Sequence, residues 1–122
     1  MDCTKEQLRE AWLTDLETTQ AEQACDRLQH KDAFCCLGRA CVVAETHGVT
    51  VHRSLDGVIL GVDLGAQPEV MAAYGFVTPQ GGEVPEGGQL PLLTNLNDSG
   101  YPFPYIAEQV RKYPQHVWKD SK

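Results

Sequence analysis

Cysteines crowd one short segment of the chain, and they are the side chains most able to do chemistry. Cys35 and Cys36 are adjacent, and Cys41 follows a little further on. Thiol catalysis there would need an exposed cysteine with a histidine within reach. The segment is apolar, however, and free cysteines in such segments behave as small hydrophobic residues. We therefore expect buried, chemically idle thiols, with no catalytic residue and no cofactor.

The same segment invites a zinc hypothesis in which Cys36, Cys41, His47 and His52 are the ligands. Zinc sites usually contain a Cys-x-x-Cys pair, and this sequence has none. A step of five residues also places Cys36 and Cys41 about 140° apart on a helix. The five cysteines are an odd number and do not indicate a disulfide framework. We expect no metal site, and thiols kept in a reducing compartment.

A polar turn near the C-terminus is the second place where chemistry is conceivable. Asn97 and Asp98 lie in an Asn-Asp-Ser-Gly sequence that faintly resembles the start of a calcium loop. The first ligand position would be the neutral Asn95, and the twelfth would be Ile106, where a bidentate glutamate is needed. The favoured interpretation is a turn that fixes the angle of the last helix. The alternative is a small polar site formed by Asn97, Asp98 and Tyr101.

Negative charge is concentrated in the middle of the chain. The net charge is −7, and the acids gather between His47 and Glu108. Such a surface repels phosphate backbones, which argues against direct nucleic-acid binding, and it attracts proteins with a basic surface. Glu83 and Glu86, in a Gly- and Pro-rich surface loop over residues 78–90, are the candidate partner contacts. The plainer alternative is that the charge only keeps the protein soluble.

The C-terminal residues 114–122 form a short basic tail that contains Trp118. Tryptophan is favoured at the centres of protein interfaces, so Trp118 is a further candidate partner contact. The alternative is that the tail packs on the body or frays.

Helical signals dominate the chain around these residues. Thr4 and Gln7 form a capping-box pattern ahead of a helix predicted over 5–18. The cysteine-rich segment has apolar residues at helical spacing and predicts a central buried helix over about 33–46. Further helical pieces are predicted by apolar residues over 67–75, 91–96 and 103–110, and residues 21–28 either extend the first helix or form a short one.

One segment has the pattern of strands. Valines at 49, 51, 58 and 62 flank a Leu-Asp-Gly turn at 55–57, which predicts a β-hairpin. The whole therefore indicates one domain, 1–122, of the α+β class. It has four to five short helices around a central apolar helix, with a small antiparallel β-hairpin or sheet. No apolar run is long enough to span a membrane, and the first residues are polar, so we expect a cytoplasmic protein.

Two motifs carry a resemblance to known proteins. One is Phe-Cys-Cys-Leu-Gly at 34–38, and the other is Leu-Asn-Asp-x-Gly at 96–100 followed by Phe103 and Ile106-Ala107. With Trp12 and the Pro-led segment 68–75, they resemble a group of small uncharacterised proteins of bacteria, phages and prophages. The resemblance implies no specific activity, and it favours an accessory protein of a mobile element.

Two functions are consistent with these features. The first is a non-enzymatic accessory protein that binds a macromolecular partner, of which an anti-defence inhibitor is one version. The second is a small enzyme or small-molecule binder with its site around Asn97 and Asp98.

Overall fold

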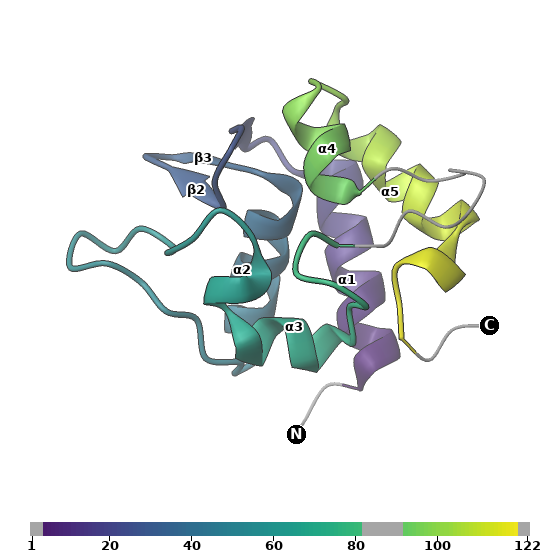
Figure 1. Cartoon of the computed structure of the whole chain (residues 1–122), viewed down its shortest axis with the longest axis horizontal. Helices are drawn as coiled ribbons and strands as arrows, with labels where there is room; N and C mark the ends of the chain where they lie inside the picture. The colour runs from purple at the N-terminus through teal and green to yellow at the C-terminus, as the bar shows by residue number, and fades with distance from the viewer. Residues whose placement is uncertain (1–3, 82–91, 120–122) are drawn as a thin grey trace.

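A computed structural model describes residues 4–81 and 92–119 (Figure 1). About half of the described residues are helical, and three very short strands form a small sheet at one side. In chain order the elements are α1 (Lys5–Thr18), β1 (Glu22–Gln23), β2 (Gln29–His30), β3 (Ala33–Phe34), α2 (Cys36–Thr46), the 3-10 helix η1 (Leu64–Ala66), α3 (Pro68–Tyr74), α4 (Leu93–Asp98), α5 (Phe103–Lys112) and the 3-10 helix η2 (Pro114–His116). The α+β class predicted from the sequence is confirmed.

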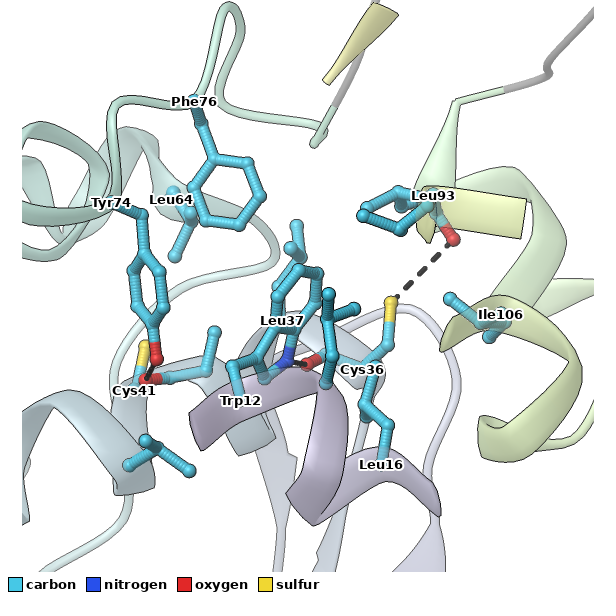
Figure 2. Close-up of a cluster of buried hydrophobic side chains, with 14 of the residues drawn as sticks. Trp12, Leu16, Cys36, Leu37, Cys41, Leu64, Tyr74, Phe76, Leu93 and Ile106 are labelled. Atoms are coloured by element: carbon cyan, nitrogen blue, oxygen red, sulfur yellow. Dashed lines mark hydrogen bonds between the residues drawn. The ribbon is translucent and has the colours of Figure 1, made fainter. Parts of the chain in front are cut away.

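Helix α1 begins where its sequence predicts. The Thr4 hydroxyl accepts from the Gln7 N–H at 3.1 Å, and the Gln7 side chain accepts from the Thr4 N–H at 2.9 Å. This reciprocal cap satisfies two N–H groups that a helix start leaves unpaired. The helix then buries Leu8, Trp12, Leu13 and Leu16. Its Trp12 indole N–H donates to the Cys36 carbonyl at 3.0 Å, which ties α1 to the start of α2 (Figure 2).

Helix α2 is the buried centre of the molecule and packs against α1, α3, α4 and β3. It begins at Cys36, whereas the sequence predicted a start near residue 33. The preceding Cys35 is the N-cap, with its sulfur accepting from the Gly38 N–H at 3.2 Å. Gly38 lies so close to the loop before β2 that an added Cβ would sit 1.8 Å from the Leu28 carbonyl oxygen. Only glycine allows this approach.

The sheet arises from residues 22–34, where no strand was expected. Strand β3 lies in the middle, antiparallel to β2 and parallel to β1. The turns between the strands hold Asp26 at φ 66° and Lys31 at φ 55°. A helix cannot contain such left-handed residues, so the expectation of a helix over 21–28 is wrong.

Residues 49–62, here called the excursion, leave the body as a long loop (Figure 1). The predicted hairpin strands are absent from it, and a single antiparallel bridge joins Arg53 to Ile59. The buried side chain of Gln67 supplies hydrogen bonds to both arms, as a β-ladder would. The Gln67 amide donates to the carbonyls of His52 at 2.8 Å and Leu60 at 2.9 Å, and it accepts from the His52 N–H at 2.8 Å. The two arms of the excursion are therefore joined through Gln67.

Helix α3 has proline at its first turn and ends at Gly75, whose φ is 78°. These features follow the predicted segment 67–75. The Tyr74 hydroxyl donates to the Ala40 carbonyl at 2.8 Å and so fastens α3 to α2 (Figure 2).

Helices α4 and α5 cover the remaining side of α1 and α2. No helix within residues 4–81 and 92–119 has the length and apolar character needed to cross a membrane.

The described part of the tail packs on the body. Trp118 is 5% exposed and pairs with Phe76 in an isolated bridge. Its ring joins an aromatic cluster with Trp12, Tyr74 and Phe76, at centroid distances of 4.7 to 6.3 Å. The expectation that Trp118 serves as a partner anchor is therefore corrected, because the ring is buried in the core. Residues up to 119 do not fray, and the last three lie outside the described residues.

Candidate functional site

The three cysteines of the apolar segment are all buried, as expected. Burial raises the pKa of the Cys35 thiol to about 11 and raises the pKa values of Cys36 and Cys41 still more strongly. The Cys36 thiol donates weakly to the Leu93 carbonyl, with the sulfur 3.7 Å from that oxygen (Figure 2). These groups remain protonated at neutral pH, and a protonated buried thiol is a poor nucleophile.

The other candidate zinc ligands have partners of their own. His47 Nδ1 lies 2.9 Å from the Val43 carbonyl, and His52 Nε2 lies 2.8 Å from the Glu69 carboxylate. Within the described residues, no group of three or more His, Cys, Asp and Glu side chains could hold a metal ion together.

Asn97 is fully buried, and every polar atom of its side chain is used within the fold. Its oxygen accepts from the Gln23 amide at 2.8 Å and from the Cys36 N–H at 3.1 Å. Its nitrogen donates to the Ala24 carbonyl at 2.6 Å and to the Asp98 carboxylate at 3.3 Å. Asn97 therefore joins α4 to the β1 region and caps the first N–H of α2. This geometry supports the structural interpretation of the turn.

The two residues grouped with Asn97 lie differently. The Asp98 carboxylate accepts from the backbone N–H of Asp26 at 3.0 Å and so holds a left-handed residue in place. Tyr101 stacks on Tyr105, with ring centroids 4.8 Å apart, and this pair is partly exposed. The three candidates are neighbours in space. Asn97 and Asp98 use their side-chain polar groups within the fold, and the Gln23 amide that donates to Asn97 also donates to the Tyr101 carbonyl at 2.7 Å.

The most unusual surface belongs to the excursion. Leu55 at its tip is fully exposed, Val62 is 65% exposed and Leu60 is 44% exposed. Beside Leu60 and Val62 lies a cleft of about 290 Å³, lined by Arg27, Gln29 and residues 58–62. Leu60 and Val62 line this cleft together, and adjoining exposed apolar side chains are typical of interaction sites.

The excursion is held in a defined shape despite projecting from the body. Besides the Gln67 contacts, the Gln29 side chain accepts from the Ile59 N–H at 2.9 Å. Arg53 forms a two-pronged ion pair with Glu45, at 2.7 and 3.0 Å. This pair lowers the pKa of Glu45 and raises the pKa of Arg53, chiefly through the side-chain hydrogen bonds. The loop therefore presents Leu55 from a fixed frame.

The chain matches no family model, no curated protein and no solved structure. The function must therefore be argued from the geometry of the molecule itself.

Sequence reasoning missed the excursion as a site because it assigned these residues to a hairpin. One signal was present. Leu55 occupies a turn position where Asn, Asp, Ser, Gly or Pro is usual, and nothing local requires a large apolar side chain there. The predicted contacts Glu83 and Glu86, with most of the loop 78–90, lie outside the described residues.

Proposed function

We propose that this protein is a non-enzymatic accessory protein that binds a protein partner through the excursion. The observation that carries the proposal is the full exposure of Leu55 at the tip of a hydrogen-bonded loop. Burying such a side chain against a partner stabilises a complex by about 1.5–3 kcal/mol. Because the loop is already shaped, little conformational freedom is lost on binding.

Charge supports a partner with a basic surface. The protein carries a net charge of −7, and Asp56 lies next to Leu55 at the tip. Opposite charges raise the rate of encounter and orient the partner, while apolar contacts hold the complex. The sequence resemblance supports an accessory protein of a phage or other mobile element that acts in the host cytoplasm. An anti-defence inhibitor would have these properties.

The test is affinity capture from host extract with three versions of the protein. These are the wild type, Leu55→Ser, and Tyr105→Ser as a control that removes an exposed apolar side chain elsewhere. We expect one host protein to be retained by the wild type and by Tyr105→Ser and to be lost with Leu55→Ser. Calorimetry with the purified partner should then show affinity weakened roughly 10- to 100-fold by Leu55→Ser.

Two outcomes contradict the proposal. One is equal binding of the wild type and Leu55→Ser, and the other is the absence of any protein retained by the wild type. Circular dichroism and a urea unfolding curve check that Leu55→Ser is folded. We expect no loss of stability beyond about 0.5 kcal/mol, because the substituted side chain is fully exposed.

A further inference from the structure

A second hollow lies on another part of the molecule, where the first turn of α1, helix α3 and the C-terminal segment meet. It measures about 260 Å³. Its lining consists of Lys5, Pro68, Met71, Ala72, Gly75 and Lys119. The hollow therefore combines an apolar side, contributed by α3, with two ammonium groups.

The fold builds this hollow at the end of α3. Gly75 turns the chain with a φ of 78°, and its carbonyl accepts from the Lys119 N–H at 2.8 Å, which brings the C-terminal segment alongside. A Cβ at position 75 would lie 2.7 Å from the Nη2 atom of Arg9 and 3.5 Å from the side-chain carbons Cδ and Cε of Lys5. Glycine at position 75 therefore lets the side chains of Arg9 and Lys5 come close to the end of α3.

The lysines of the hollow differ from three of the arginines in their charge partners. Arg39, Arg53 and Arg111 are each matched with an acid, as in Arg39–Asp15 at 2.8 Å and Arg111–Glu10 at 2.8 Å. Across residues 4–81 and 92–119, the structure gives the side chains of Lys5 and Lys119 neither an ion pair nor a hydrogen bond. Two lysines that form no ion pair among the described residues therefore line one hollow, in a protein with a net charge of −7.

We propose that this hollow binds a small organic acid, in which a carboxylate is carried on an apolar group. The carboxylate would pair with Lys5 and Lys119, and the apolar group would lie on Pro68, Met71 and Ala72. A lysine ammonium acts as a mobile point charge, which suits a single carboxylate without demanding a fixed geometry. The volume is slightly below the usual range for pockets that hold drug-sized molecules, so the ligand is smaller than these. The site is separate from the excursion and does not depend on the proposed partner.

The test is a titration of ¹⁵N-labelled protein with phenylacetate, followed by nuclear magnetic resonance. We expect saturable shifts of the backbone amides of Lys5, Met71, Ala72, Gly75 and Lys119. Phenylacetamide has nearly the same shape without the charge, and we expect it to shift these amides at least tenfold less at the same concentration. Added salt should weaken phenylacetate binding, because both lysines are exposed.

Variants make the test specific. The double variant Lys5→Gln/Lys119→Gln should lose phenylacetate binding, and Ala72→Glu should lose it by placing a carboxylate in the hollow. Lys112→Gln removes an equal charge on α5 and should bind as the wild type does. The proposal is overturned if the double variant binds phenylacetate normally, or if phenylacetamide binds equally well. Leu55→Ser should leave phenylacetate binding unchanged. A failure of this proposal can therefore be told apart from a failure of the proposal that the excursion binds a protein partner.

Discussion

The side-chain oxygen of Asn97 accepts a hydrogen bond from the backbone N–H of Cys36, at 3.1 Å and 61 positions apart in the sequence. This contact caps the central helix from a distant element. The sequence predicts a turn at Asn97, whereas this residue lies in α4 and its side chain is buried in the core.

Replacing Asn97 should destabilise the protein strongly. Asn97→Ala leaves the Cys36 N–H and the Ala24 carbonyl without their partners in a buried region. Each unsatisfied buried group costs about 1–3 kcal/mol, so the free energy of unfolding should fall by about 2–4 kcal/mol in urea titrations. Asn95→Ala, at an exposed position of the same helix, is the control and should change it by less than about 0.5 kcal/mol. A similar small effect for both variants would contradict the structural role of Asn97.

Gly38→Ala should be severely destabilising, although alanine favours helices by about 1 kcal/mol over glycine. The new methyl group would lie 1.8 Å from the Leu28 carbonyl oxygen, a backbone atom that cannot move aside alone. We expect a loss of more than about 3 kcal/mol, or a protein that does not fold. Gly57→Ala is the matched control, because it has open space and only the strain of φ 83°, which costs about 1 kcal/mol. If Gly38→Ala were as stable as the wild type, α2 and Leu28 could not lie as close together as described here.

Gln67→Ala should loosen the excursion without unfolding the body. The change removes three hydrogen bonds that join His52 and Leu60 to the fold. Hydrogen exchange should therefore become faster at the amides of residues 52–60 than in α1 or α2. If Leu55 is the partner contact, affinity should also fall, because the loop must then be ordered on binding. Gln20→Ala, at an exposed position, is the control and should leave both the exchange rates and the affinity unchanged.

The buried thiols should make stability fall at alkaline pH. Burial raises the pKa of Cys35 from 9.0 to about 11, so between these values the unfolded chain releases a proton that the folded chain keeps. The unfolded state then binds fewer protons, and stability declines as pH rises, by about 1.4 kcal/mol per pH unit for this group. Urea titrations from pH 9 to pH 11 should show a shallower decline for Cys35→Ala than for the wild type. If stability declined equally with pH in Cys35→Ala and in the wild type, the raised pKa of Cys35 would be refuted.

Local signals in the sequence were sufficient to predict α1 and α2, but not to exclude a helix over 21–28. The capping box at Thr4 and Gln7 and the apolar spacing around Cys36 and Cys41 depend on residues within a few positions of one another, and both helices form where these signals lie. The burial of Cys35, Cys36 and Cys41 followed from the same apolar spacing.

The sheet is local, within residues 22–34, whereas the shape of the excursion and the role of Asn97 depend on contacts between residues further apart, which no local pattern reveals. The valines around 49–62 favour strands by propensity, yet the two arms share only one bridge. Two direct backbone hydrogen bonds, from the Leu60 N–H to the His52 carbonyl and from the Ser54 N–H to the Val58 carbonyl, join the arms, and the Gln67 side chain adds further bonds to His52 and Leu60. The role of Asn97 depends on Gln23, Ala24 and Cys36, all far away in the sequence. Gly38, an unfavourable residue inside a helix, was the one local hint that another backbone comes close.

Gln67 reaches the excursion through main-chain atoms of His52 and Leu60, so the shape of the loop is largely independent of the side chains displayed at its tip. Residues such as Leu55 and Asp56 can then change from one lineage to another while the frame beneath them stays the same. If the excursion binds a partner as proposed, its tip can be altered to fit a changed partner surface, and the same property makes the loop a suitable place to graft foreign recognition sequences.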